Sequence, residues 1–159
     1  MANELTHDFG NGLVAAHRHT NGGGWVADTA TVDATAYVGP DATVQGHGCV
    51  TGYGCVTGYG RVMEHGIVTG HGCVTGYGCV TGYGIVMDHG RVMDDGCVRD
   101  NGSVRDNGCV MDNGIVRDNG RVMDCGSVDG CGCVRDNGCV RDNGCVRDNG
   151  VVGGDTVLG

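Results

Sequence analysis

Residues 49–72 read CVTGYGCVTGYGRVMEHGIVTGHG, which is four copies of one six-residue unit with valine in its second position. The valine recurs at every sixth position from Val26 to Val152, giving 22 valines in one unbroken register, and Leu158 extends the register by one step. Two residues before each of these valines stands a glycine or an alanine. The chain is therefore a tandem repeat of the pattern small-x-Val-x-x-x.

This spacing predicts a short strand followed by a tight corner of two or three residues in every unit. Residues two apart in a strand point to the same side, so the valine and the preceding small residue face inward together. Segments such as TGYG at 51–54 and RDNG at 99–102 are rich in residues that tolerate the left-handed backbone of tight corners. We therefore predict an all-β, single-domain coil that turns the same way at each unit.

The sequence ATVDATAYVGPD at 30–41 resembles the hexapeptide motif of left-handed parallel β-helix proteins. Three hexapeptides form one triangular coil of 18 residues in that family, so the resemblance implies a left-handed β-helix of about seven coils over residues 22–159. The start of the repeat, GGGWVADTA at 22–30, is similar to bacterial and phage hexapeptide-repeat proteins. Residues 1–21 lie outside the repeat, and we expect them to form a short N-terminal cap over the exposed edge of the first coil.

Composition excludes several classes of protein. Glycine is 34 of 159 residues, but in segments such as 52–60 the glycines alternate two and four positions apart, which excludes a collagen helix. The unbroken valine register argues against glycine-rich disorder. A net charge of −9 disfavours a nucleic-acid partner. The sequence has no apolar run that spans a membrane and no signal peptide, so we expect no membrane partner and a cytoplasmic or virion-associated location.

The chain is rich in cysteine, with 11 residues, of which nine directly precede a valine. An 18-residue coil stacks Cys55 on Cys73 and Cys79 on Cys97, with Cα atoms about 4.8 Å apart. That separation lies within the range that a disulfide spans. The odd total and the absence of a secretion signal favour reduced thiols, with cross-coil disulfides as the alternative.

Four corner histidines are candidate metal ligands. On an 18-residue coil His47 stacks on His65 and His71 stacks on His89, and two imidazoles at that separation could share a metal ion. The alternative is that histidine belongs to the polar set, with tyrosine and asparagine, that the corner tolerates. Two ligands also fall short of a complete zinc site. No cofactor is expected.

The resemblance implies an alternative function as well. Many left-handed β-helix proteins are homotrimeric acyltransferases, and some are metal-binding carbonic anhydrases of the γ class. The acyltransferases usually carry a protruding loop and a C-terminal helical segment, and this sequence shows neither. A carbonic anhydrase needs three histidines around one zinc, but His65 and His71, the nearest pair, fall on different corners. We therefore expect no enzyme activity.

The second half of the chain carries a different chemistry. Its corners read Arg-Asp-Asn-Gly, so Arg99, Arg117 and Arg135 are expected to form one column beside a column of aspartates. This is either a solvated, self-neutralising surface or a zwitterionic contact face.

In the first half, residues 49–72 are nearly repeated at 73–96. This repeat has a period of four units, so on a three-unit coil it moves each feature to the next face. No face is therefore reserved for a flat ligand such as ice.

Isoleucine and cysteine at outward positions, such as Ile67, Ile85 and Ile115, suggest packing against another copy. We therefore expect a non-enzymatic structural or interaction solenoid that self-assembles. A dimer, a trimer and an end-to-end stack through the final coil are all open.

Overall fold

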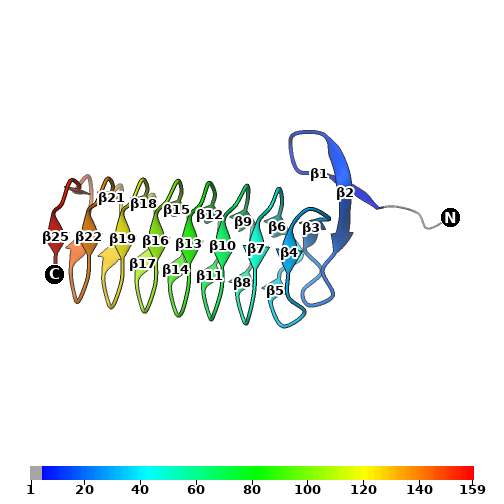
Figure 1. Ribbon diagram of the computed structural model, residues 1–159, viewed down its shortest axis with the longest axis horizontal. Helices are drawn as coiled ribbons and strands as arrows, with labels where there is room; N and C mark the ends of the chain where they lie inside the picture. The colour runs from blue at the N-terminus through cyan, green and yellow to red at the C-terminus, as the bar shows by residue number, and fades with distance from the viewer. Residues whose placement is uncertain (1–4) are drawn as a thin grey trace.

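The computed structural model describes residues 5–159, and these form a rod of stacked coils without a helix (Figure 1). Three parallel sheets line the rod, so each turn of the chain contributes one strand to each sheet. The result is a β-solenoid of about 7 turns of ~18 residues, as the sequence predicts. No helix among the described residues is long and apolar enough to cross a membrane.

The first sheet contains ten strands. They are β1 (Thr6–Asp8), β2 (Leu13–Arg18), β3 (Trp25–Ala27), β6 (Thr43–Val44), β9 (Arg61–Val62), β12 (Cys79–Val80), β15 (Cys97–Val98), β18 (Ile115–Val116), β21 (Cys133–Val134) and β24 (Val151–Val152).

The second and third sheets contain eight and seven strands. The second sheet consists of β4 (Thr31–Val32), β7 (Cys49–Val50), β10 (Ile67–Val68), β13 (Ile85–Val86), β16 (Ser103–Val104), β19 (Arg121–Val122), β22 (Cys139–Val140) and β25 (Val157–Leu158). The third sheet consists of β5 (Tyr37–Val38), β8 (Cys55–Val56), β11 (Cys73–Val74), β14 (Arg91–Val92), β17 (Cys109–Val110), β20 (Ser127–Val128) and β23 (Cys145–Val146).

The parallel strands pair residues that are 18 apart in the chain. Val50 lies beside Val68, and Val68 lies beside Val86, with no shift of register. The inward valines from Val38 to Val152 are almost completely buried, which confirms the predicted core. Branched side chains of this kind pack well between strands. Stacked valine layers therefore fill the interior of the rod.

From Gly46 onward, each corner turns at a residue with positive φ, two positions after the valine. These residues are glycine at most corners up to Gly82 and aspartate at most corners beyond it, as at Gly52 (φ 64) and Asp106 (φ 55). Aspartate is one of the few residues with a side chain that adopts this conformation readily. The next amide then bonds to the following coil, as from His47 N to Glu64 O at 2.7 Å. The corners are therefore hydrogen-bonded along the rod like the strands.

The N-terminal strands form an antiparallel hairpin at one end of the rod (Figure 1). Strand β2 pairs antiparallel with β3, which covers the edge of the first sheet. His19 is buried there with its Nε2 3.0 Å from the carbonyl oxygen of Ala36, and Asn21 Nδ2 donates to the same oxygen at 2.9 Å. The Arg18 guanidinium lies 4.2 Å from the centre of the Trp25 ring. Residues 1–4 of the predicted cap lie outside the described residues.

Candidate functional site

The third residue after each valine projects from a corner and stacks on its counterparts in neighbouring coils. At the corner that follows the first sheet, the rings of His47 and His65 lie 5.2 Å apart, and those of His65 and Tyr83 lie 4.9 Å apart. The ring planes differ by 13° and 4°. This corner therefore carries a continuous column of three parallel rings.

The other two corners carry similar columns. After the second sheet, Tyr53 stacks on His71 at 5.3 Å, and His71 stacks on His89 at 5.1 Å. After the third sheet, Tyr59 stacks on Tyr77 at 5.0 Å. The tyrosines are strongly exposed, with Tyr53 at 65%. The sequence predicted the two histidine pairs, but the extension of each pair by a tyrosine was not foreseen.

The geometry of the histidine pairs bears on metal binding. An imidazole nitrogen directs its lone pair in the plane of the ring. The planes of His71 and His89 differ by only 4°, so their lone pairs run side by side without meeting. Within residues 5–159, no group of three or more His, Cys, Asp or Glu side chains is placed to hold a metal ion. A shared ion at His47–His65 or at His71–His89 would therefore require one ring to turn, and metal binding there stays a prediction.

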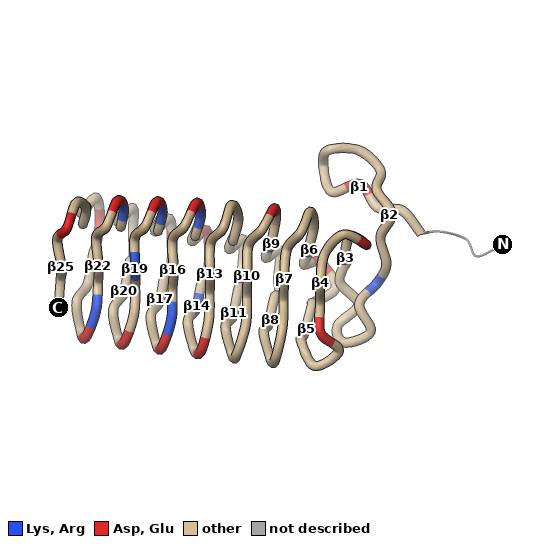
Figure 2. The backbone as a smooth tube through the Cα atoms, in the orientation of Figure 1, with Lys and Arg blue, Asp and Glu red and all other residues tan. Residues whose placement is uncertain are grey.

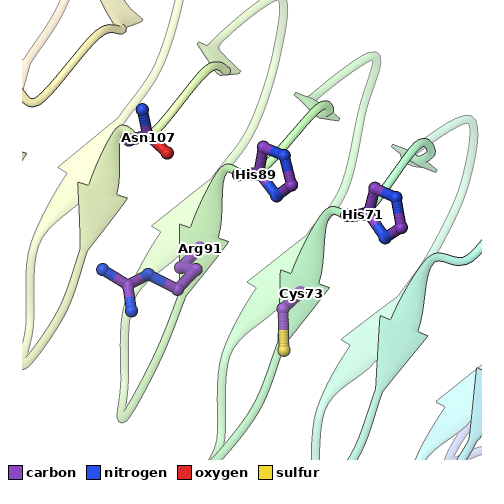
Figure 3. Close-up of a pocket in the computed structure, with 5 residues that line it drawn as sticks. All are labelled: His71, Cys73, His89, Arg91 and Asn107. Carbon is purple, nitrogen blue, oxygen red and sulfur yellow. The ribbon is translucent and has the colours of Figure 1, made fainter.

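A shallow hollow of about 370 Å³ lies beside the second of these columns (Figure 3). His71, His89 and Asn107 line its corner side, while Cys73 on β11 and Arg91 on β14 line its sheet side. The hollow brings a thiol and a guanidinium from adjacent strands into one place. Cys73 and Arg91 are 18 residues apart, so the length of one coil could have predicted that they lie side by side.

The eleven cysteines are all free thiols. The two predicted stacks are present, with Cys55 in register with Cys73 and Cys79 in register with Cys97. An arginine stands next in the same outward column of each stack: Arg91 lies beside Cys73, and Arg61 lies beside Cys79. These arginine neighbours were not predicted from the sequence.

These surroundings change the acidity of the stacked thiols. A hydrogen bond from Cys55 and the positive charge of Arg91 lower the pKa of Cys73 to about 7, against the opposing effect of partial burial. The pKa of Cys55 is raised in turn, first because Cys55 keeps its proton in the hydrogen bond to Cys73. Partial burial raises this pKa further, as does the second negative charge that ionisation of Cys55 would place beside Cys73.

The second stack behaves in the same way. A hydrogen bond from Cys79 lowers the pKa of Cys97 to about 7, against the opposing effect of partial burial. The charges of Arg99 and Arg61 lower this pKa further, and that of Asp100 raises it. One thiol of each stack is therefore poised to ionise near neutral pH.

Two outward cysteines are more buried than the sequence suggested. Cys109 and Cys139 are only 5% and 6% exposed. Both precede an inward valine and so face outward, but long neighbouring side chains cover them. The sulfur atom of Met123, for example, lies 4.0 Å from Cys139 Sγ. Burial is the main cause that raises the pKa of Cys109.

The charged side chains gather in the C-terminal half of the rod, with arginine beside aspartate (Figure 2). The predicted column is present: the ion pairs Arg99–Asp100, Arg117–Asp118 and Arg135–Asp136 measure 4.0, 3.5 and 3.9 Å. Their side chains are about one-third to one-half exposed, so each pair contributes about 1 kcal/mol or less. This column neutralises its own charge within one chain.

No protein-family model matches the chain, and none of the curated proteins is significantly similar to it.

Proposed function

We propose that this protein is a non-enzymatic structural rod that associates with a second copy of itself through the outer face of its second sheet. The single observation that carries the proposal is an uncharged patch on three adjacent strands of that sheet. The patch consists of the outward residue of β7, β10 and β13 and the residue that directly follows each strand, namely Cys49, Thr51, Ile67, Thr69, Ile85 and Met87. We call it the second-sheet patch.

The second-sheet patch is flat and regular. Ile67 lies in register between Cys49 and Ile85 on the adjacent strands. Thr51 donates to Thr69 across the neighbouring column, from one Oγ1 to the other at 2.9 Å. All six side chains are half-buried by their neighbours and present only their outer surfaces. A partner with an equally flat, uncharged surface fits this patch, and another copy of the rod offers one.

The strands that flank the patch carry opposite charges. Asp33 directly follows β4 on the N-terminal side, and Arg105 directly follows β16 on the C-terminal side. Each is two strands away from β10 in the order of the sheet. The Nε atom of Arg105 is buried and has no hydrogen-bond partner within the described residues, and it forms an ion pair of 3.8 Å with Asp106 Oδ2. The patch is therefore bounded by one anion and one cation at equal distances from Ile67.

This symmetry selects the orientation of the second copy. A twofold axis along the strand direction through β10 lays Ile67 on the partner's Ile67 and places Asp33 opposite the partner's Arg105. The same operation forms the ion pair twice, because a twofold interface is self-complementary. A parallel arrangement of the rods would instead bring Asp33 near its own counterpart. We therefore infer an antiparallel side-by-side dimer.

The second-sheet patch and its two flanking strands form a narrow surface, because five strands at about 4.8 Å spacing extend over only about 20 Å. An interface of this size is weak and depends on concentration. Sedimentation velocity over a range of protein concentrations tests the proposal. We expect a reversible monomer–dimer equilibrium in the wild type and a monomer for Ile67→Glu. The matched control is Ile115→Glu, which changes the same repeat position on the first sheet and should leave the equilibrium unchanged.

Charge exchange tests the orientation. Arg105→Asp and Asp33→Arg should each weaken association, and the double variant Asp33→Arg/Arg105→Asp should recover it, because the pair is re-formed with its signs reversed. Equal association of Ile67→Glu and the wild type would overturn the proposal. A double variant no better than its single variants would overturn the antiparallel orientation.

A further inference from the structure

We propose that the two cysteine stacks, Cys55–Cys73 and Cys79–Cys97, each bind one soft, two-coordinate metal ion of the Cu(I) class. Both pairs lie in register on adjacent parallel strands, with their side chains on the outer surface. They belong to the third and first sheets. The proposal is therefore independent of self-association through the second sheet.

The spacing of the coils suits a single bridging ion. In-register residues on adjacent strands are about 4.8 Å apart. Thiolate–metal bonds are about 2.3 Å long in zinc thiolates, so two such bonds in line span about 4.6 Å, which is close to that spacing. The same spacing also lies within the range that a disulfide spans, so the two thiols must be reduced for the ion to bind.

The number of available ligands identifies the class of metal. No third His, Cys, Asp or Glu side chain joins either stack within residues 5–159. Structural zinc takes four ligands, so a two-thiol site does not suit it. Soft thiolate ligands select Cu(I), which accepts two of them. Each stack therefore matches Cu(I) in both the type and the number of its ligands.

Charge at the sites supports the same assignment. Binding replaces two thiol protons with one Cu(I) ion, so the bis-thiolate complex carries one negative charge and two protons are released. Arg91 lies in register with Cys73, and Arg61 lies in register with Cys79, on the next strand in each case. Each complex thus has a cation beside it that balances its charge.

The other cysteines have no partner of this kind. Cys109 lies between Arg91 and Ser127, and Cys139 lies between Arg121 and Val157. Cys49 is next to Thr31 and Ile67. The arrangement therefore predicts two high-affinity ions per chain, despite the total of eleven thiols.

Anaerobic titration of the fully reduced protein with Cu(I), in competition with a chromophoric Cu(I) chelator, tests the proposal. We expect the wild type to retain two ions, Cys55→Ser to retain one, and Cys55→Ser/Cys79→Ser to retain none. The control Cys109→Ser/Cys133→Ser should retain two. Serine suits these positions, because Ser103 and Ser127 already occupy the same place in the repeat. Equal circular dichroism spectra of all variants would establish that the solenoid is intact.

X-ray absorption of the loaded wild type should show two sulfur atoms around each copper. The loaded protein should also melt at a higher temperature than the metal-free protein, because the folded state holds the paired thiols in place and binds the ion more tightly than the unfolded chain does, and the double variant should show no such shift. Retention of two ions by Cys55→Ser/Cys79→Ser would overturn the proposal. Loss of all copper from the wild type to the chelator, or copper that links two chains, would also overturn it.

Discussion

Gly120 lies so close to the following coil that a Cβ atom added to it would stand 2.6 Å from the carbonyl oxygen of Val134. Other inner glycines are equally confined; at Gly66, for example, the added atom would lie 2.7 Å from Val80 O. Near the N-terminus, Ala36 and Ala42 occupy the same repeat position and are fully buried. The coil thus accepts alanine at Ala36 and Ala42 and closes around glycine at positions such as Gly66 and Gly120.

This closeness predicts that Gly120→Ala destabilises the protein. The obstructing atom belongs to the backbone, which cannot turn aside as a flexible side chain would. Overpacking of this kind costs about 1–3 kcal/mol in the free energy of unfolding. Gly153→Ala is the control, because its Cβ would meet only the side chains of Arg135 and Asp136, at 3.2 Å. Chemical denaturation measures the free energy of unfolding of both variants. Equal values for Gly120→Ala and Gly153→Ala would contradict the close packing at Gly120.

The valine core predicts a contrast between two substitutions of the same type. Val86→Ala should lower the free energy of unfolding by about 2 kcal/mol, because Val86 is fully buried and its truncation leaves a cavity. Val157→Ala should have little effect, since Val157 is 53% exposed. Urea titration followed by circular dichroism compares the two. A similar loss for both variants would mean that the two positions do not differ in burial.

The corners predict that the stability of the protein depends on which residue occupies a position with positive φ. Asp106 has a φ of 55°, in a region that alanine avoids. Asp106→Ala should therefore destabilise the protein by about 1 kcal/mol, whereas Asp106→Gly, which also removes the carboxylate, should cost much less. Thermal unfolding measures the difference. If glycine were as damaging as alanine, the cost would come from the lost ion pair with Arg105 and not from the backbone.

The Cys55–Cys73 stack predicts a pH-dependent reactivity. The thiolate is the reactive form, so the lowered pKa of Cys73 makes it alkylate with a midpoint near pH 7. Cys55→Ala and Arg91→Gln should each move this midpoint to higher pH, because they remove the hydrogen bond and the positive charge that favour the thiolate. Mass spectrometry of iodoacetamide-treated protein measures the profile. A midpoint that neither substitution moves would show that these neighbours do not control Cys73.

The strand positions follow directly from the sequence, because one unbroken period places every valine. Val50, Val68 and Val86 are equivalent in the repeat, and the 18-residue coil then brings them into register. The same arithmetic predicts that His47 stacks on His65 and Cys55 on Cys73. Stacking of this kind is a matter of backbone register, so it needs no knowledge of side-chain packing.

The remaining features depend on what the side chains do once they are stacked. Cys109 is outward in the repeat yet buried, because its cover comes from other units of the chain. The tight approach of Gly120 to Val134 depends on the width of the coil, which the period alone does not determine. The extension of the histidine pair to Tyr83 requires the ring orientations as well as the positions. These properties arise between coils and have no signature within one six-residue unit.

Residues 18 apart in the sequence lie side by side along the whole rod. Isotope-edited NMR tests this register directly through nuclear Overhauser contacts between backbone protons of adjacent strands. We expect contacts from residues 49–50 to 67–68, from 67–68 to 85–86, and at the same offset for each later strand. Contacts at an offset of 12 or 24 residues, or none between coils, would contradict it.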